Sequence, residues 1–198
     1  MTRINKLVDV EKNKNPNKMI VGTITPSGNQ GYFYTKLSNY LYRILDKISN
    51  NKYQFYYYQQ NDIKKLIQSV DEAKIVFFDT YNSCDTVGAL DEQMSNIKLS
   101  SQKELFDLLN AYSNINVLYT TSEEATICLR KIIQNIDYYS KERTSMKKAE
   151  EQLYSNLNRK IEIIKLYSPA RYAINRLGGG QQGIENAANK WMQKGFNI

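Results

Sequence analysis

The sequence has 198 residues, of which 41% are hydrophobic and 24% charged, a composition typical of a globular domain. It contains no histidine, which excludes Ser-His-Asp and Cys-His catalysis, histidine-ligated zinc and histidine acid–base chemistry. The length fits one domain, so we expect a polar tail over residues 1–18 and a single domain over residues 19–198.

The net charge of +7 is spread along the chain without an Arg-rich block. We interpret it as a solvated surface, which makes nucleic acid an unlikely partner. No apolar run approaches the roughly 18 residues of a membrane span, and the N-terminal residues lack a signal-peptide core. The two cysteines, Cys84 and Cys128, are too few for a disulfide framework. We therefore expect a cytoplasmic protein with free thiols and no membrane contact.

In the first half of the chain, short apolar runs alternate with helical periodicity. Residues 19–24 form the first predicted strand, and apolar residues at helical spacing predict an amphipathic helix over 32–48. The aromatic run 53–58 predicts a second strand. Asn61 or Asp62 can cap the helix that follows.

The second half continues the alternation. The continuous apolar run 74–78 predicts a third strand, central in a parallel sheet, and a long polar stretch follows it. A helix around Leu105 precedes a fourth strand at 115–120, and Ser122 can cap the next helix. A fifth strand is predicted at 160–167. A glycine joint follows at Gly178, Gly179 and Gly180, and a closing helix carries Ile184, Ala187, Ala188, Trp191 and Met192.

Five strands alternating with helices predict an α/β fold, a three-layer sandwich with a five-stranded parallel sheet. Ligands of such sheets bind beyond the carboxyl ends of the strands. We therefore expect a site in the loops after the first, third and fourth strands.

The loop after the first strand reads TPSGNQG, residues 25–31. Its hydroxyls, amide and glycines, together with the start of the next helix, suit an anion. It resembles the phosphate loop of flavodoxin-like flavoproteins, and the wider segment VGTITPSGNQGYFYTKLSNYL is similar to the opening of the NAD(P)H-dependent FMN reductases. The resemblance implies a flavodoxin-like fold with the FMN phosphate on Thr25, Ser27, Gly28, Asn29 and Gln30.

A second segment, DEAKIVFFDTYNSCDTVGALDEQM, resembles the third strand and following loop of the same family. The resemblance implies further FMN contacts from Thr80, Tyr81, Asn82 and Ser83, and by position from Thr121 and Ser122. It implies an FMN-dependent oxidoreductase or electron carrier that uses NAD(P)H or a redox partner protein, and it allows a homodimer. Asp79 departs from the family, which commonly has proline there.

Two alternatives remain open. The departure at Asp79 and the net positive charge favour a binding module that keeps the fold without a cofactor and engages a macromolecular partner. The acidic residues beyond the third strand favour a nucleoside- or nucleotide-processing enzyme in which Glu92 is the nucleophile or base.

Overall fold

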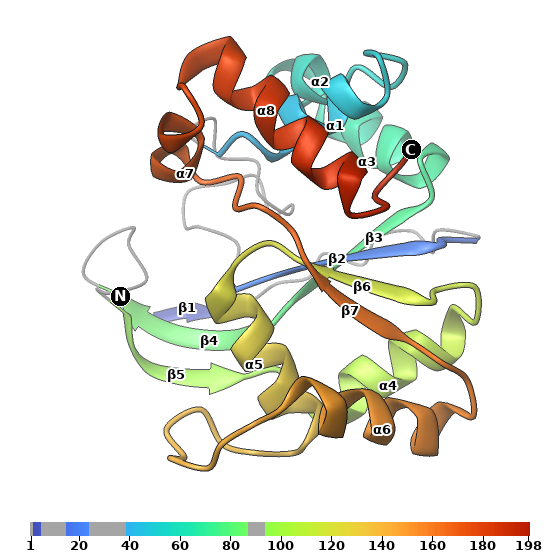
Figure 1. The fold of residues 1–198 in the computed structure, drawn as a ribbon, viewed down its shortest axis with the longest axis vertical. Coiled ribbons are helices and arrows are strands. Elements are labelled where there is room, and N and C mark those ends of the chain that lie inside the picture. The colour runs from blue at the N-terminus through green and yellow to red at the C-terminus, as the bar shows by residue number, and fades with distance from the viewer. Residues whose placement is uncertain (1, 5–14, 24–38, 87–93) are drawn as a thin grey trace.

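The computed structural model describes residues 2–4, 15–23, 39–86 and 94–198 (Figure 1). The strands are β1 Thr2–Ile4, β2 Lys18–Gly22, β3 Ile75–Asp79, β4 Tyr81–Thr86, β5 Met94–Leu99, β6 Val117–Thr120 and β7 Glu162–Lys165. The helices are α1 Leu41–Ile48, α2 Phe55–Asn61, α3 Ile63–Glu72, α4 Gln102–Ala111, α5 Glu123–Ile133, α6 Met146–Leu157, α7 Arg171–Arg176 and α8 Gly180–Gln193.

A parallel sheet with helices on both faces confirms the predicted α/β fold. Its strand order is β3-β2-β6-β7, and all three pairings are parallel. The sheet has four strands in the described part of the chain, so the prediction of five is wrong. The strand at 74–78 is confirmed as β3, but it lies at the edge of this sheet and not at its centre.

The aromatic run 53–58 was predicted to be a strand, but its residues 55–58 form the start of α2. The carboxylate of Asp46 accepts hydrogen bonds from the backbone N–H groups of Phe55 and Tyr56, both at 2.8 Å. These bonds satisfy two of the N–H groups that a helix start leaves unpaired. Phe55 and Gln59, one helical turn apart, are both buried. A cap supplied by α1 and burial at helical spacing thus outweigh the strand propensity of the aromatic residues.

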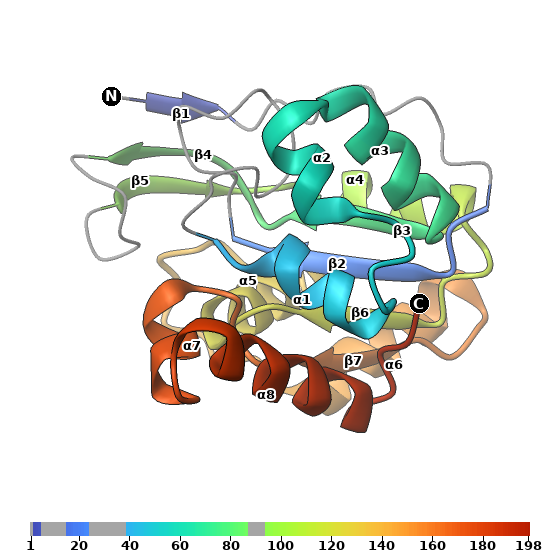
Figure 2. The same cartoon turned by 90° about the horizontal axis from the view of Figure 1, so that it is seen from above.

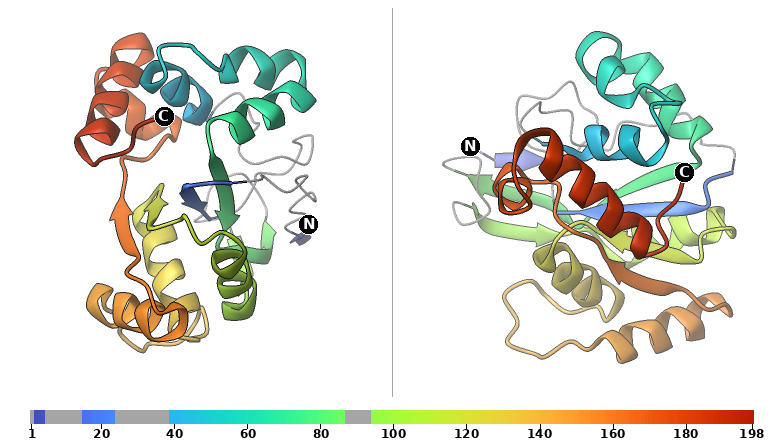
Figure 3. Two further views of the ribbon diagram at one scale, coloured as in Figure 1. Left: turned by 90° about the vertical axis from the view of Figure 1, so that its right-hand side faces the viewer. Right: turned by 45° about the horizontal axis from the view of Figure 1, so that its top comes forward.

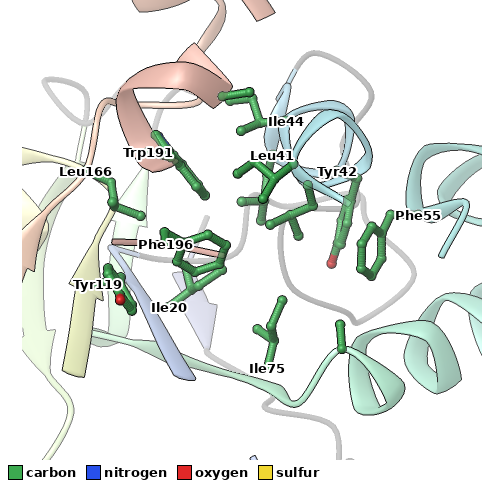
Figure 4. Close-up of a cluster of buried hydrophobic side chains, with 14 of the residues drawn as sticks. Ile20, Leu41, Tyr42, Ile44, Phe55, Ile75, Tyr119, Leu166, Trp191 and Phe196 are labelled. Atoms are coloured by element: carbon green, nitrogen blue, oxygen red, sulfur yellow. The ribbon is translucent and has the colours of Figure 1, made fainter. Parts of the chain in front are cut away.

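Two helical layers enclose the sheet (Figure 3). The β2 side chains alternate between the two layers. Ile20 belongs to an aromatic-rich core under α1, α2, α3 and α8, which also contains Trp191 and Phe196 (Figure 4). Met19 and Val21 point to the opposite face and join an aliphatic core under α4, α5 and α6. This alternation is the period of two that a strand imposes.

A second sheet lies beyond the end of β3 (Figure 2). It is antiparallel, with the order β1-β4-β5, and occupies much of the polar stretch that carried no strand prediction. Its strand β1 falls within the segment expected to be a polar tail. No helix among the described ranges is long and apolar enough to cross a membrane.

Candidate functional site at the carboxyl edge of the parallel sheet

The four parallel strands end together at one edge, which we call the carboxyl edge. From β2 the chain passes to β3 on one side, whereas β6 lies on the other side of β2. The first connection runs over one face of the sheet and the connection after β6 over the other. In open α/β sheets such a reversal opens a crevice beyond the strand ends, where ligands bind.

Backbone hydrogen bonds join the end of β2 to the segments that follow β3 and β6, and on the β3 side they continue past it. The N–H of Thr80 donates to the carbonyl of Gly22 at 2.9 Å, and the N–H of Tyr81 donates to that of Thr23 at 2.7 Å. On the other side, the N–H of Thr121 donates to the carbonyl of Val21 at 2.9 Å. The segments after β3 and β6 are therefore both fixed to the last residues of β2, and Tyr81 extends this contact to Thr23.

Polar side chains at this edge are fully shielded from water. Asp79 and Thr80 are both 0% exposed. Ser100 ties their backbone down, because its hydroxyl donates to the carbonyl of Asp79 at 2.7 Å and its N–H donates to that of Thr80 at 2.8 Å. The Oγ1 atom of Thr80 has no hydrogen-bond partner within the described part of the chain. A buried hydroxyl without a partner is available for a hydrogen bond to a ligand.

Next to these residues, one carboxylate oxygen gathers three donors. Oε1 of Glu124, in the first turn of α5, accepts from the hydroxyls of Tyr81 at 2.9 Å and Tyr138 at 3.1 Å and from the Cys128 thiol at 3.4 Å. We call these four residues the Glu124 cluster. Burial raises the pKa of Tyr81 and of Cys128 well above their usual values, and it raises the pKa of Tyr138 to about 12. All three donors therefore keep their protons at neutral pH.

Among the predicted contacts, Thr80, Tyr81 and Thr121 lie together at the carboxyl edge. The hydroxyl of Thr121 donates to the carbonyl of Val21 at 3.2 Å, so it serves the fold. Ser122 accepts from the N–H of Ala125 at 3.0 Å, which confirms it as the cap of α5.

The other predicted contacts are not at this edge in the described structure. Asn82 and Ser83 belong to β4, and Ser83 pairs with Ile4 of β1. The phosphate-loop residues and the predicted base lie outside the described residues, namely Thr25, Ser27, Gly28, Asn29, Gln30 and Glu92.

Helix α7 flanks the carboxyl edge and was not predicted from the sequence (Figure 1). The N–H of Tyr40, ahead of α1, donates to the carbonyl of Pro169 at 2.9 Å, which fixes the approach to α7. Tyr172 is 62% exposed, and the Arg176 guanidinium carbon lies 5.8 Å from its ring centroid. Arg171 is also exposed. The sequence signal for this helix was Arg171, Tyr172 and Arg176, a few residues after the last strand.

Packing against α8 sets the position of α7. A Cβ atom added to Gly183 of α8 would lie 2.5 Å from the carbonyl oxygen of Ile174 in α7. Such a contact is shorter than atoms tolerate, so the two helices approach this closely because residue 183 has no side chain.

These features define an α/β protein with a four-stranded parallel sheet and a buried polar carboxyl edge. No protein-family model matches the chain, and no curated protein matches its sequence. Its fold is similar to the solution NMR structure of a "putative Uracil DNA glycosylase" from Methanosarcina acetivorans, with a TM-score of 0.54 and 14% identity. The match covers 88% of this chain and 89% of that one.

This similarity corrects two expectations. The resemblance to flavodoxin-like FMN reductases is wrong, because the similar structure belongs to a different fold family and the sheet has four parallel strands where five were predicted. The FMN-dependent oxidoreductase function, with its NAD(P)H or redox partner, is withdrawn with it. The expectation that nucleic acid is an unlikely partner is also overturned, since the similar structure carries the name of a DNA glycosylase.

Proposed function

We propose that this protein binds nucleic acid at the carboxyl edge and removes a base that has been turned out of the stack. The name of the similar structure supports this class of reaction, and it agrees with the alternative of a nucleotide-processing enzyme. In the reaction, water adds to C1′ of the sugar while the bond from C1′ to the base nitrogen breaks. The base leaves with the bonding electrons and takes up a proton, and the sugar keeps a hydroxyl group.

The observation that carries the proposal is the complete burial of Asp79 and Thr80 where the parallel strands end. A carboxylate in a water-excluded site interacts strongly with positive charge that develops on the sugar. Asp79 is therefore our candidate for this role. The Thr80 hydroxyl is the candidate for a hydrogen bond to the displaced base, because its oxygen has no partner in the described ranges.

The exposed side of α7 suits the rest of such a substrate. Arg171 and Arg176 carry positive charge for phosphates, and the exposed ring of Tyr172 offers a surface on which a base can stack. Enzymes that act on a base in a duplex must extrude it, and contacts beside the pocket help to offset the lost stacking. The overall charge of +7 favours the same partner.

The proposal is tested with labelled oligonucleotides that contain uracil or another deaminated base, in single- and double-stranded form. Base release is read as strand cleavage by alkali at the abasic site. We expect release by the natural protein and a loss of about 100-fold or more in Asp79→Asn. Asp85→Asn is the matched control, because Asp85 lies in β4 of the second sheet and should retain activity.

The outcomes separate the candidate functions. Release of no base and no binding of any oligonucleotide would overturn the proposal. Binding without release of any base tested would favour the module that engages a macromolecular partner without chemistry. Equal activity in Asp79→Asn and the natural protein would remove Asp79 from the mechanism.

A further inference from the structure

The connection from α5 to α6 runs beside β5 of the second sheet (Figure 1). We call residues 137–143 the α5–α6 loop. The ring of Tyr138 lies edge-on to Tyr81, with 5.7 Å between centroids, and its hydroxyl reaches Glu124. Tyr81 follows β3 and Glu124 begins α5, so the loop borders the edge opposite the segment that leads into α7.

A buried lysine holds this loop in shape. The ammonium group of Lys131 donates to the backbone carbonyls of Asp137 at 3.3 Å, Ser140 at 3.0 Å and also Tyr138. The Asp137 carboxylate in turn accepts from the N–H of Tyr139 at 2.9 Å. One charged group thus gathers three backbone carbonyls of this turn, which fixes the course of the chain there.

Tyr139 is fixed in place and yet open to solvent. Its hydroxyl oxygen accepts the N–H of Ile97 in β5 at 2.9 Å, and its ring stands at 87° to that of Tyr138 with 5.0 Å between centroids. The residue is nevertheless 60% exposed. A ring held in advance loses little conformational entropy when a ligand stacks on it.

Positive charge is present in the same loop and in the strand to which Tyr139 is bonded. Lys141 and Arg143 are exposed in the loop, and Lys98 is exposed in β5 next to Ile97. Glu142 is the acidic residue between the two loop cations. An aromatic surface flanked by cations is the arrangement that binds unpaired bases and their phosphates.

We propose that the α5–α6 loop is a second nucleic-acid contact, which binds a single-stranded stretch next to the carboxyl edge. The Tyr139 ring stacks on one unpaired base, and Lys141 and Arg143 contact the phosphates on either side. Stacking on a single ring tolerates any base, so this contact adds affinity without sequence preference. The inference rests on the proposed function only in taking nucleic acid as the partner.

The test uses the full chain and a fluorescein-labelled single-stranded DNA of mixed sequence, with binding followed by anisotropy. Tyr139→Ala should bind about ten-fold more weakly, whereas Tyr139→Phe keeps the stacking ring, loses only its anchoring hydrogen bond and should lose much less affinity. Tyr57→Ala is the matched control, because Tyr57 is 59% exposed on α2, away from the carboxyl edge. Replacing both Lys141 and Arg143 by glutamine should lower the slope of log K against log salt by about 1.4.

Separate outcomes identify which proposal fails. If the natural protein binds no DNA, the proposed function and this contact fall together. If Tyr172→Ala weakens binding while Tyr139→Ala binds normally, the second contact alone is overturned. An equal loss in Tyr139→Phe and Tyr139→Ala would also overturn it, because the anchoring hydroxyl and not the ring would then be responsible.

Discussion

The core beneath α8 and the interior of the carboxyl edge are both shielded from water, yet they are built from different chemistry. Beneath α8, Trp191 and Phe196 are 0% exposed and pack edge to face, 5.3 Å between centroids. At the edge, Asp79, Thr80, Tyr81 and Cys128 are buried, and the last two donate to the half-buried Glu124. The core gains stability from the removal of apolar surface from water. A polar atom buried at the edge costs free energy unless it has a partner, as the hydroxyl of Tyr81 has and that of Thr80 has not in the described ranges.

This comparison predicts the largest loss of stability at Trp191. Replacing it by alanine removes a large apolar group and the hydrogen bond from its Nε1 to the carbonyl of Tyr167, which is 2.8 Å long. We expect the free energy of unfolding in urea, followed by circular dichroism, to fall by about 3–5 kcal/mol. Tyr172→Ala, at an exposed position, should stay within about 0.5 kcal/mol. A loss below about 1 kcal/mol in Trp191→Ala would contradict this account of the core.

An intermediate loss is expected when the acceptor of the Glu124 cluster is removed. In Glu124→Ala the hydroxyl of Tyr81 stays buried without its partner, and we expect unfolding to become easier by about 1–3 kcal/mol. Glu124→Gln retains a carbonyl oxygen that can accept, and it should lose less. Equal thermal stability of Glu124→Ala and the natural protein would show that the cluster adds nothing to the fold.

The smallest effect on stability is expected at Thr80, although its effect on activity should be clear. Valine has nearly the shape of threonine, and the Thr80 hydroxyl has no described partner to lose. We expect Thr80→Val to change the free energy of unfolding by less than about 0.5 kcal/mol while base release falls about 3- to 10-fold, the contribution of one hydrogen bond. A loss of about 2 kcal/mol in stability would instead give this hydroxyl a structural partner.

The sequence predicted the elements whose local pattern and burial agree. The apolar runs at β2, β3, β6 and β7 are confirmed, as are the caps at Asp62 and Ser122. The prediction of a strand at 53–58 is wrong because the decisive group, the Asp46 carboxylate, belongs to the preceding helix. The second sheet was missed because its strands β4 and β5 are polar and lack the alternation of a half-buried strand.

The position of the candidate site follows from the strand ends and stays a prediction, whereas its composition required the structure. The rule that ligands bind beyond the strand ends selects the segment that contains Thr80 and Tyr81. The cluster around Glu124 could not be predicted, because Tyr138 is brought to Tyr81 by a turn of the chain between α5 and α6. Likewise, nothing in the order of residues indicates that Lys131 holds this turn.

The close approach of α7 and α8 requires glycine at position 183, which no substrate would touch. Gly183 lets α7 rest against α8, so a side chain there would push outward the short helix that displays Tyr172. The height of that ring above the strand ends is thus set by an interior residue. A change at position 183 would move the exposed surface of α7 without altering any atom on it.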